Sequence, residues 1–183
     1  MMTTTPGDVL DFWFAPETRL LWFAGDADFD RRVGEQWAAA HEQAAAGALD
    51  GWRETPAGYL ALILLLDQAP RHLFRGTPRA FATDGAALVL AHEAIDRALD
   101  LGFRSDRRLF VYLPFEHSEA LADQQASVFL IRTRIGRSGY LDYAERHLRI
   151  IERFGRFPHR NAILGRESTA EELAFLSEPG SSF

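Results

Sequence analysis

Charged and polar side chains gather in three stretches of the sequence, and their types fit acid–base chemistry and anion binding. The first polar segment runs from Asp67 to Asp84, the second from Tyr112 to Val128 and the third from Arg153 to Arg166. Guanidinium groups bind phosphate or carboxylate, whereas carboxylate and imidazole groups exchange protons or ligate metals. These groups suffice for general acid–base catalysis, for holding a small anion or for an oxygen-rich metal site.

In the first polar segment, Asp67 and Gln68 follow LALILLL, the most apolar run of the chain. A charged side chain buried there needs a partner. Arg71 is four residues further on, and Pro70 is expected to break the helix between them. We predict that Asp67, Gln68, Arg71 and Arg79 bind a ligand. The alternative is a helix end held by an Asp67–Arg71 ion pair, with Arg79 in solvent.

In the second polar segment, Glu116, Glu119 and Asp123 are spaced so that one continuous helix would carry all three on one stripe. Like charges at this spacing repel, so arginines, a divalent metal or a cationic ligand should face them. We predict Glu116 and Glu119 as general bases or metal ligands. Asp123 and His117 are predicted to bind the ligand. The alternative is a solvated acidic stripe.

The third polar segment, RFGRFPHRNAILGR, places polar side chains beside apolar ones in a loop between two helices. Phe157 should dock inward and thereby fix its neighbours in place. We predict His159 as a catalytic proton donor. Arg156, Arg160 and Asn161 are predicted to bind the ligand. Alternatively, the arginines cap carbonyl groups and pair with carboxylates of the second polar segment. The complementary charges predict that the segments meet in space.

Helices are expected to position these segments, because apolar residues recur at helical spacing and no strand alternation appears. We therefore predict an all-α fold in one domain, residues 1–183, with residues 176–183 as a frayed tail. Thr5 and Pro6 begin the first helix, and Thr83 caps the fourth. The predicted ranges of the later helices are residues 29–46, 59–69, 84–99, 118–135, 141–154 and 168–176, the last opened by a capping box from Ser168 to Glu171.

Composition limits the classes of function. The net charge of -6 argues against nucleic-acid and anionic-membrane binders. With no cysteine, disulfides, thiolate catalysis and zinc–thiolate sites are excluded. No signal peptide and no apolar run long enough for a bilayer is visible, which predicts a soluble, cytoplasmic protein. No phosphate loop or Rossmann glycine run occurs, so no organic cofactor is expected; a divalent metal would use Glu116, Glu119 and Asp123.

Several longer stretches resemble the bacterial domain-of-unknown-function family 924. They are VLDFWF, WF followed by DFD, LALILLLDQAPRHLFRGTPRAFATD, YLPFEHSE and RFGRFPHRNAILGRESTAEE, and they extend from Val9 to Glu172. The resemblance implies a helical, tetratricopeptide-like fold, here a right-handed array or bundle of about 7–9 helices. It also implies that the three polar segments are the family's signature. The family commonly has Phe and Asn at the positions of Ala69 and His72, so His72 weakens any role that needs an amide. The family supplies no reaction.

Three functions fit the sequence. In the first, the three polar segments line one pocket for a small anionic ligand, and the protein is a hydrolase or an isomerase if chemistry occurs. In the second, a helical scaffold binds an acidic peptide through the same arginines. In the third, the charges form a buried ion-pair network without a ligand site. Short polar clusters favour a pocket over a long groove, and whether the protein is an enzyme stays open.

Overall fold

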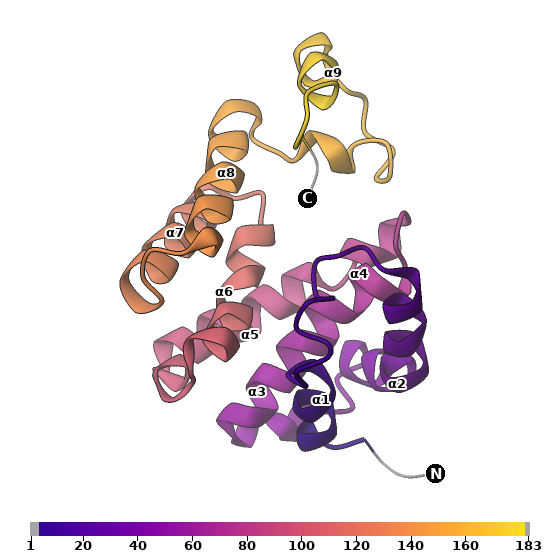
Figure 1. Cartoon of the computed structure of the whole chain (residues 1–183), viewed down its shortest axis with the longest axis vertical. Helices are drawn as coiled ribbons and strands as arrows, with labels where there is room; N and C mark the ends of the chain where they lie inside the picture. Colours follow the sequence, from indigo (N-terminus) through magenta and orange to yellow (C-terminus); the bar gives the residue numbers. More distant parts are fainter. Residues whose placement is uncertain (1–3, 182–183) are drawn as a thin grey trace. The chain divides into compact units, whose positions relative to one another are not determined.

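The computed structural model describes residues 4–181, and these residues form helices joined by turns and loops, with no strand among them (Figure 1). The all-α prediction is therefore confirmed. The described chain divides into two compact units. Unit 1 comprises residues up to 75 together with residues 79–114, and unit 2 comprises residues 76–78 and those from 115 onward. The tetratricopeptide-like array and the single-domain organisation stay predictions.

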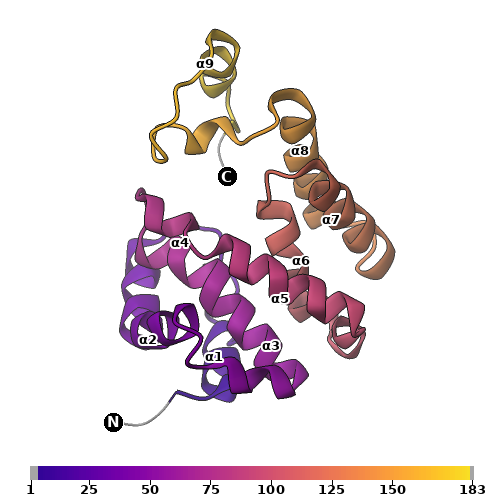
Figure 2. The same ribbon diagram turned by 180° about the vertical axis from the view of Figure 1, so that it is seen from behind.

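Unit 1 is built around the apolar helix α3. Its elements are α1 (Pro6–Trp13), α2 (Ala27–Ala45), η1 (Asp50–Glu54), α3 (Pro56–Ile63), η2 (Leu64–Gln68), α4 (Ala69–Leu73), α5 (Asp84–Asp96) and η4 (Leu99–Gly102). The short η3 (Pro78–Phe81) and the longer α6 (Ser105–His117) each begin in one unit and end in the other. Helix α3 packs against α1 and α5, as Figure 2 shows, and α2 packs against α4.

Short polar residues cap the starts of α1 and α3 in unit 1. Thr5 and Asp8 form a reciprocal capping box at the start of α1. Thr55 caps α3, because its hydroxyl accepts a hydrogen bond of 3.0 Å from the N–H of Gly58. A Cβ atom at Gly58 would lie 1.9 Å from the carbonyl oxygen of Trp52. Only glycine therefore lets the start of α3 approach η1 this closely.

An aromatic core joins the helices of unit 1. The Trp13 side chain on α1 is fully buried, and its ring centroid lies 5.1 Å from that of Trp37 and 5.5 Å from that of Phe110. The indole N–H of Trp22 donates to the carbonyl oxygen of Trp13 at 2.8 Å. Aromatic pairs at such separations contribute roughly 0.5–1.5 kcal/mol each beyond the area that they bury. The core thus ties α1, α2 and α6 together.

The apolar helix does not end near Ala69, as the sequence predicted, but continues through a π-helical turn. This turn, η2, spans Leu64–Gln68, and the N–H of Ala69 donates to the carbonyl oxygen of Leu64. The chain then continues directly into α4, with Pro70 in the first turn of that helix. Proline is tolerated in a first turn, where an N–H has no helical partner to lose. Pro70 therefore continues the helical path that it was expected to break.

Two side chains bind the carbonyl groups that the π turn and Pro70 leave without their α-helical donors. The Nδ1 atom of His41 lies 2.8 Å from the carbonyl oxygen of Leu65. The hydroxyl of Thr83 donates to the carbonyl oxygen of Leu66 at 2.6 Å. Thr83 occupies the predicted N-cap position of α5, yet its side chain makes no capping bond there. The cap is replaced by a bond that stabilises the π turn.

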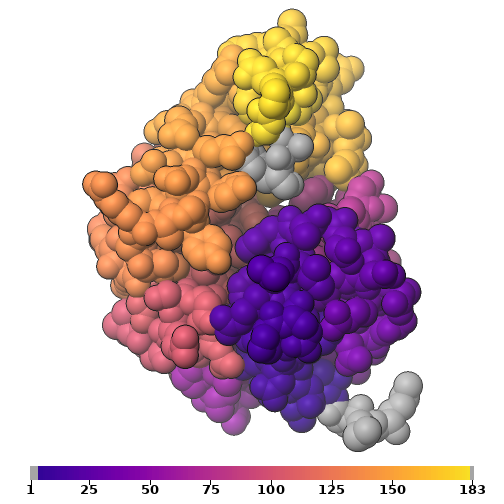
Figure 3. All heavy atoms as spheres, in the orientation of Figure 1, coloured from indigo at the N-terminus to yellow at the C-terminus, as the bar shows by residue number. Residues whose placement is uncertain are grey.

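Unit 2 consists of a helix pair followed by a loop and a short helix. Helices α7 (Leu121–Arg134) and α8 (Gly139–Phe154) lie side by side in both ribbon views, and they pack against each other. The turn η5 (Pro158–Arg160) and α9 (Ala170–Leu176) complete the unit. In Figure 3 the atoms of α9 and its flanking residues form a compact cluster at the yellow end of the colour range.

Helix boundaries in the second half of the chain differ from the predictions. Helix α6 was missed, because it carries Pro114 and is buried over most of its C-terminal half, which leaves no apolar period to detect. Helix α7 begins at Leu121 and not at Ser118. Helix α8 closely matches its predicted range, and the chain leaves it at Gly155, which has a left-handed φ of 66°.

The last helix begins one residue later than its predicted capping box. The box is formed by Thr169 and Glu172, whose side chain accepts from the N–H of Thr169 at 2.7 Å. Beyond α9, the hydroxyl of Ser181 donates to the carbonyl oxygen of Leu176 at 3.1 Å. This bond lies within the tail that was predicted to fray, and the fraying stays a prediction. Residues 182–183 of that prediction lie outside the described residues.

Candidate functional site

The first polar segment lies in unit 1, apart from residues 76–78, and ion pairs connect residues within it. Asp67 is fully buried, and its carboxylate accepts a hydrogen bond of 2.6 Å from the amide of Gln68. Arg71 donates to both carboxylate oxygens of Asp84, at 2.8 and 3.0 Å, and lies 3.6 Å from the carboxylate of Asp67. Burial opposes the charge of Arg71, but the two aspartates raise its pKa overall. Arg71 is therefore a paired cation in this structure.

Arg79 is also paired within unit 1. Its guanidinium group donates to the carboxylate of Glu42 at 2.6 Å and lies 3.7 Å from the ring centroid of Phe74. Both charged side chains are largely exposed, so this pair contributes at most about 1 kcal/mol to stability. The geometry explains Arg79 without a ligand.

The three carboxylates of the second polar segment do not share one helix, which corrects the predicted stripe. Glu116 lies in the last turn of α6, Glu119 in the following link and Asp123 in the first turn of α7. The helix breaks here because Ser118 turns the chain: its hydroxyl donates to Asp123 at 2.6 Å and accepts from the N–H of Ala120 at 3.1 Å. Within the described chain, no three His, Asp or Glu side chains are grouped as metal ligands would be.

Two predicted ligand-binding residues of the third polar segment hold the end of the chain in place. Arg156 donates to both carboxylate oxygens of Glu172, at 2.6 and 2.7 Å, which lowers the pKa of Glu172 to about 2. The amide of Asn161 donates to the hydroxyl of Ser168 at 3.0 Å and accepts from Arg166 at 3.0 Å. These contacts fix the loop between α8 and α9.

Glu119 joins the second polar segment to the third. Its carboxylate accepts two hydrogen bonds from Arg166, at 2.7 and 2.9 Å, and one from the backbone N–H of Phe157 at 2.8 Å. Burial opposes the ionisation of Glu119, yet the hydrogen bonds from Arg166 and Phe157 and the charges of Arg166 and Arg160 lower its pKa. The prediction that these two segments meet is therefore supported. The arginine that Glu119 binds is Arg166, which the sequence analysis did not single out.

Glu116 pairs with a histidine that sequence reasoning missed. Glu116 is 4% exposed and His147 is 6% exposed, and the Glu116 carboxylate lies 3.3 Å from Nδ1 of His147. The same Nδ1 lies 2.9 Å from the carbonyl oxygen of Tyr143. Burial, the largest cause, lowers the pKa of His147 to about 3, and the nearby basic side chains of the third polar segment act in the same direction. His147 is thus neutral at pH 7.

The ring of Phe157 holds further basic groups beside this pair. Phe157 is fully buried, and its ring centroid lies 5.5 Å from that of His147 and 5.6 Å from that of His159. The guanidinium carbon of Arg160 lies 4.6 Å from the same centroid. His117 is close enough to His147 to lower its pKa by charge repulsion. We define the imidazole cluster as Glu116, His117, His147, His159 and Arg160.

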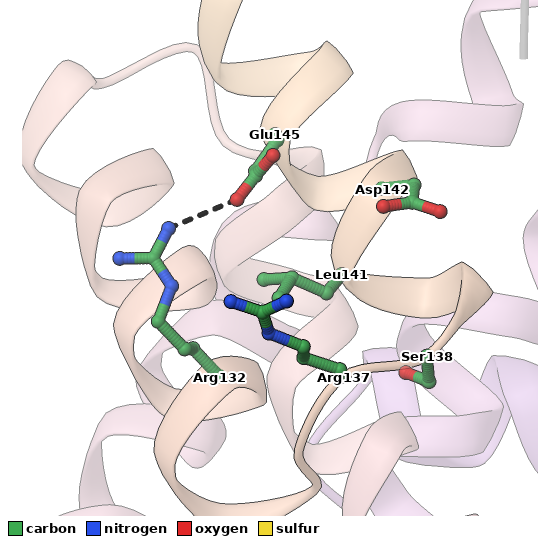
Figure 4. Close-up of a pocket in the computed structure, with 6 residues that line it drawn as sticks. All are labelled: Arg132, Arg137, Ser138, Leu141, Asp142 and Glu145. Carbon is green, nitrogen blue, oxygen red and sulfur yellow. Dashed lines mark hydrogen bonds and ion pairs between the residues drawn. The ribbon is translucent and has the colours of Figure 1, made fainter.

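A separate pocket of about 500 Å³ opens at the turn between α7 and α8 (Figure 4). It contains none of the predicted site residues. Its lining residues are Arg132, Arg137, Ser138, Leu141, Asp142 and Glu145. Arg132 and Glu145 form an ion pair of 2.9 Å across one side, and the Arg137 side chain extends toward this pair in Figure 4.

The structure thus brings two of the three polar segments together. Glu116, Glu119, His159 and Arg160 all lie in unit 2, where the imidazole cluster and the Glu119–Arg166 pair share the Phe157 anchor. The first polar segment lies in unit 1, apart from residues 76–78, and its meeting with the other two stays a prediction. Residues missed by sequence reasoning are His147 and Arg166. A charge-complementarity search around Glu116 and Glu119 would have found Arg166 at the end of the third polar segment.

No helix in the described part of the chain has the length and apolar character needed to cross a bilayer.

Comparisons with known proteins place the chain in an uncharacterised group. A family model described as "Bacterial protein of unknown function (DUF924)" matches residues 9–180. A solved structure, "Structure of Protein of Unknown Function ATU0120 from Agrobacterium tumefaciens", is similar with 46% sequence identity and a TM-score of 0.88. That match covers 94% of this chain and 96% of the other. No curated protein matches the sequence significantly.

Proposed function

Because the chain belongs to the bacterial family DUF924, whose description names no activity, we propose a function from the site alone: unit 2 binds a small anionic molecule at the imidazole cluster. The observation that carries this proposal is the buried carboxylate of Glu116, 3.3 Å from the neutral imidazole of His147. Burying a carboxylate beside an uncharged ring is costly unless other groups compensate it. Such pairs concentrate at functional sites.

Arg160 is the residue that favours an anionic ligand. Three of the four arginines predicted to hold an anion are instead paired with aspartate or glutamate, namely Arg71, Arg79 and Arg156. Arg160 is 7% exposed and lies over the ring of Phe157 beside His159, and its charge helps to lower the pKa of Glu119. A desolvated guanidinium group binds carboxylate or phosphate strongly through paired hydrogen bonds. The anion therefore belongs at Arg160.

The tautomer of His147 defines the chemistry that the cluster can perform. Both neighbours of Nδ1, the Tyr143 carbonyl and the Glu116 carboxylate, are hydrogen-bond acceptors, so Nδ1 carries the proton and Nε2 is an acceptor. With a pKa of about 3, His147 is a poor base at pH 7, but its Nε2 can orient a ligand or a water molecule by accepting a hydrogen bond, and the buried carboxylate of Glu116 beside it is the group that would take a proton. Hydrolysis and isomerisation both need such a base. The proposal therefore extends to a hydrolase or isomerase in which His147 orients the ligand or water and Glu116 acts as the base.

Isothermal titration of the full chain tests the proposal. The probes are inorganic phosphate, succinate and pyruvate, each with and without Mg²⁺. We expect at least one to bind, and Arg160→Gln to weaken it by roughly tenfold or more, as expected for a charge-assisted pair. Arg149→Gln is the matched control, because Arg149 is exposed on α8. Arg137→Gln reports on the separate pocket at the turn between α7 and α8.

Two results would count against this site. Equal affinity in Arg160→Gln and wild type, with loss in Arg137→Gln, would move anion binding to the other pocket. If no probe binds, the ion-pair network is favoured over a ligand site. The bidentate pairs Arg156–Glu172 and Arg166–Glu119 are consistent with such a network. Long-range ¹H–¹⁵N spectra of histidine at pH 7 provide an independent check, since His147 should show the neutral, Nδ1-protonated form.

A further inference from the structure

The pocket at the turn between α7 and α8 is a cavity that the proposed function does not use. Its volume of about 500 Å³ is sufficient for a small molecule, and none of its lining residues belongs to the imidazole cluster. Backbone hydrogen bonds fix the turn that forms it. The N–H groups of Ile135 and Gly136 donate to the carbonyl oxygen of Ile131, at 3.0 and 2.9 Å, and the N–H of Leu141 donates to that of Ser138 at 3.0 Å. The cavity is therefore formed before any ligand arrives.

One side of this pocket carries an excess of positive charge. Arg132 pairs with Glu145 at 2.9 Å, and the Arg137 side chain extends toward the same pair (Figure 4). Arg137 is exposed, and its guanidinium group forms no ion pair or hydrogen bond with any residue that the structure describes. Two guanidinium groups thus share one carboxylate. Because guanidinium groups bind carboxylate and phosphate through paired N–H donors, this side is suited to an anionic group.

The opposite charge lies on another side of the pocket. Asp142, in the first turn of α8, is exposed, and its carboxylate has no ion pair or hydrogen bond among residues 4–181. In Figure 4 it lies on the far side of Leu141 from the Arg132–Glu145 pair. Leu141 is 7% exposed and supplies apolar surface to the pocket. The lining therefore presents a cationic and an anionic group that are separated by a short apolar surface.

The balance of these charges specifies the ligand class. The lining as a whole is neutral, because its two arginines are matched by one aspartate and one glutamate. A ligand with negative charge alone would pair with Arg137 but would meet a like charge at Asp142. A ligand that carries both signs pairs with both residues and lays its methylene groups on Leu141.

We infer that the pocket at the turn between α7 and α8 binds a small zwitterion, an amino carboxylate, with its carboxylate at Arg137 and its ammonium group at Asp142. The inference goes beyond the proposed function, which concerns an anion at the imidazole cluster, and does not depend on it.

Linear amino carboxylates of increasing length test this inference on the full chain. Glycine, β-alanine and γ-aminobutyrate are each compared with their two one-charge analogues, which for γ-aminobutyrate are butyrate and n-propylamine. Titrations followed by ¹H–¹⁵N spectra report both the affinity and the place of binding. We expect at least one amino carboxylate to bind roughly tenfold or more tightly than either analogue, because each analogue leaves one charge of the pocket unpaired. The amide resonances of Gly139 and Leu141 should shift.

Arg137→Gln and Asp142→Asn are the informative variants. Both side chains are exposed and make no ion pair within the described chain, so each variant should keep the thermal midpoint of wild type. Each should weaken binding of the amino carboxylate by roughly tenfold or more. Arg137→Gln should leave the affinity for the amine analogue unchanged, and Asp142→Asn should leave the affinity for the carboxylate analogue unchanged or raised. Arg149→Gln, at an exposed position of α8, is the matched control.

The outcomes separate this inference from the proposed function. Equal affinity for an amino carboxylate and its carboxylate analogue, or loss in Arg137→Gln without loss in Asp142→Asn, would overturn the inference and leave a simple anion site. Binding that both variants retain but Arg160→Gln loses would also overturn it, because the ligand would then lie at the imidazole cluster. If no amino carboxylate binds, the inference is wrong. The proposed function would still stand on the binding of phosphate, succinate or pyruvate and its loss in Arg160→Gln.

Discussion

The Glu119–Arg166 pair should be one of the strongest side-chain interactions in unit 2, and a double-mutant cycle measures it. Glu119 accepts three hydrogen bonds, two of them from Arg166, and the two side chains are 28% and 25% exposed. Exposed ion pairs contribute about 0–1 kcal/mol, whereas breaking a buried pair costs about 3–5 kcal/mol. The partial burial and bidentate geometry place the expected coupling between these limits, at roughly 1–2 kcal/mol.

The measurement is urea unfolding of wild type, Glu119→Gln, Arg166→Gln and the double variant. Glu119→Gln alone should lower the free energy of unfolding by roughly 2 kcal/mol, because the charged acceptor of three bonds is lost. Urea is preferred to guanidinium chloride, whose ions would screen the pair. A coupling energy below about 0.5 kcal/mol would refute the reasoning and class this pair with ordinary surface pairs.

The same cycle has a definite pH dependence. The pKa of Glu119 is lowered in the folded protein from its ordinary value of 4.5, so its ionised form stabilises the fold. This contribution is fully present above pH 4.5 and is lost as the pH falls through the lowered, folded-state value. The coupling to Arg166 should therefore be constant near neutral pH and decrease in acid. A coupling that increases on acidification would contradict the assignment.

Two further predictions concern the scaffold in unit 1. Thr83→Val removes the hydroxyl that binds the carbonyl oxygen of Leu66 and should lower the free energy of unfolding by about 1–2 kcal/mol, whereas Thr133→Val, which removes an exposed hydroxyl, should cost less than about 0.5 kcal/mol in the same urea titration. Gly58→Ala places a Cβ atom 1.9 Å from a backbone carbonyl oxygen and should cost about 3 kcal/mol or more, whereas Gly85→Ala, with open space around its Cβ, should be neutral or stabilising; equal effects would refute the steric argument.

The start of α1 and the end of α8 were predictable because they depend on residues close together in the sequence. The capping box of Thr5 and the left-handed Gly155 both act within a few residues of the helix end. The π turn was not predictable in this way. It is stabilised by His41 and Thr83, which lie 24 and 17 residues away from the carbonyl groups that they bind. Only the packing of unit 1 brings these side chains to the turn.

The candidate site was predictable in its residue types but not in its pairings. Glu116 and Glu119 stand out in the sequence, because carboxylates on a largely apolar stretch need partners. Their partners are 31 and 47 residues further along the chain, so their identity depends on how α8 and its following loop fold back. His147 was missed because it lies on the apolar face of an amphipathic helix, where the sequence pattern indicates core.

Whether carboxylates of the protein already bind an arginine determines whether that arginine can hold a ligand. An arginine cluster in a sequence predicts anion binding only if nearby carboxylates do not take up the guanidinium groups first. In this chain, bidentate contacts with aspartate or glutamate hold Arg71, Arg156 and Arg166, and each contact satisfies the donors that a phosphate or carboxylate ligand would need. A ligand would have to displace a carboxylate already bound in nearly ideal geometry. Arg160 is desolvated over the ring of Phe157, and its charge helps to lower the pKa of both His147 and Glu119; this burial, more than the number of arginines, is the feature on which the proposed site rests.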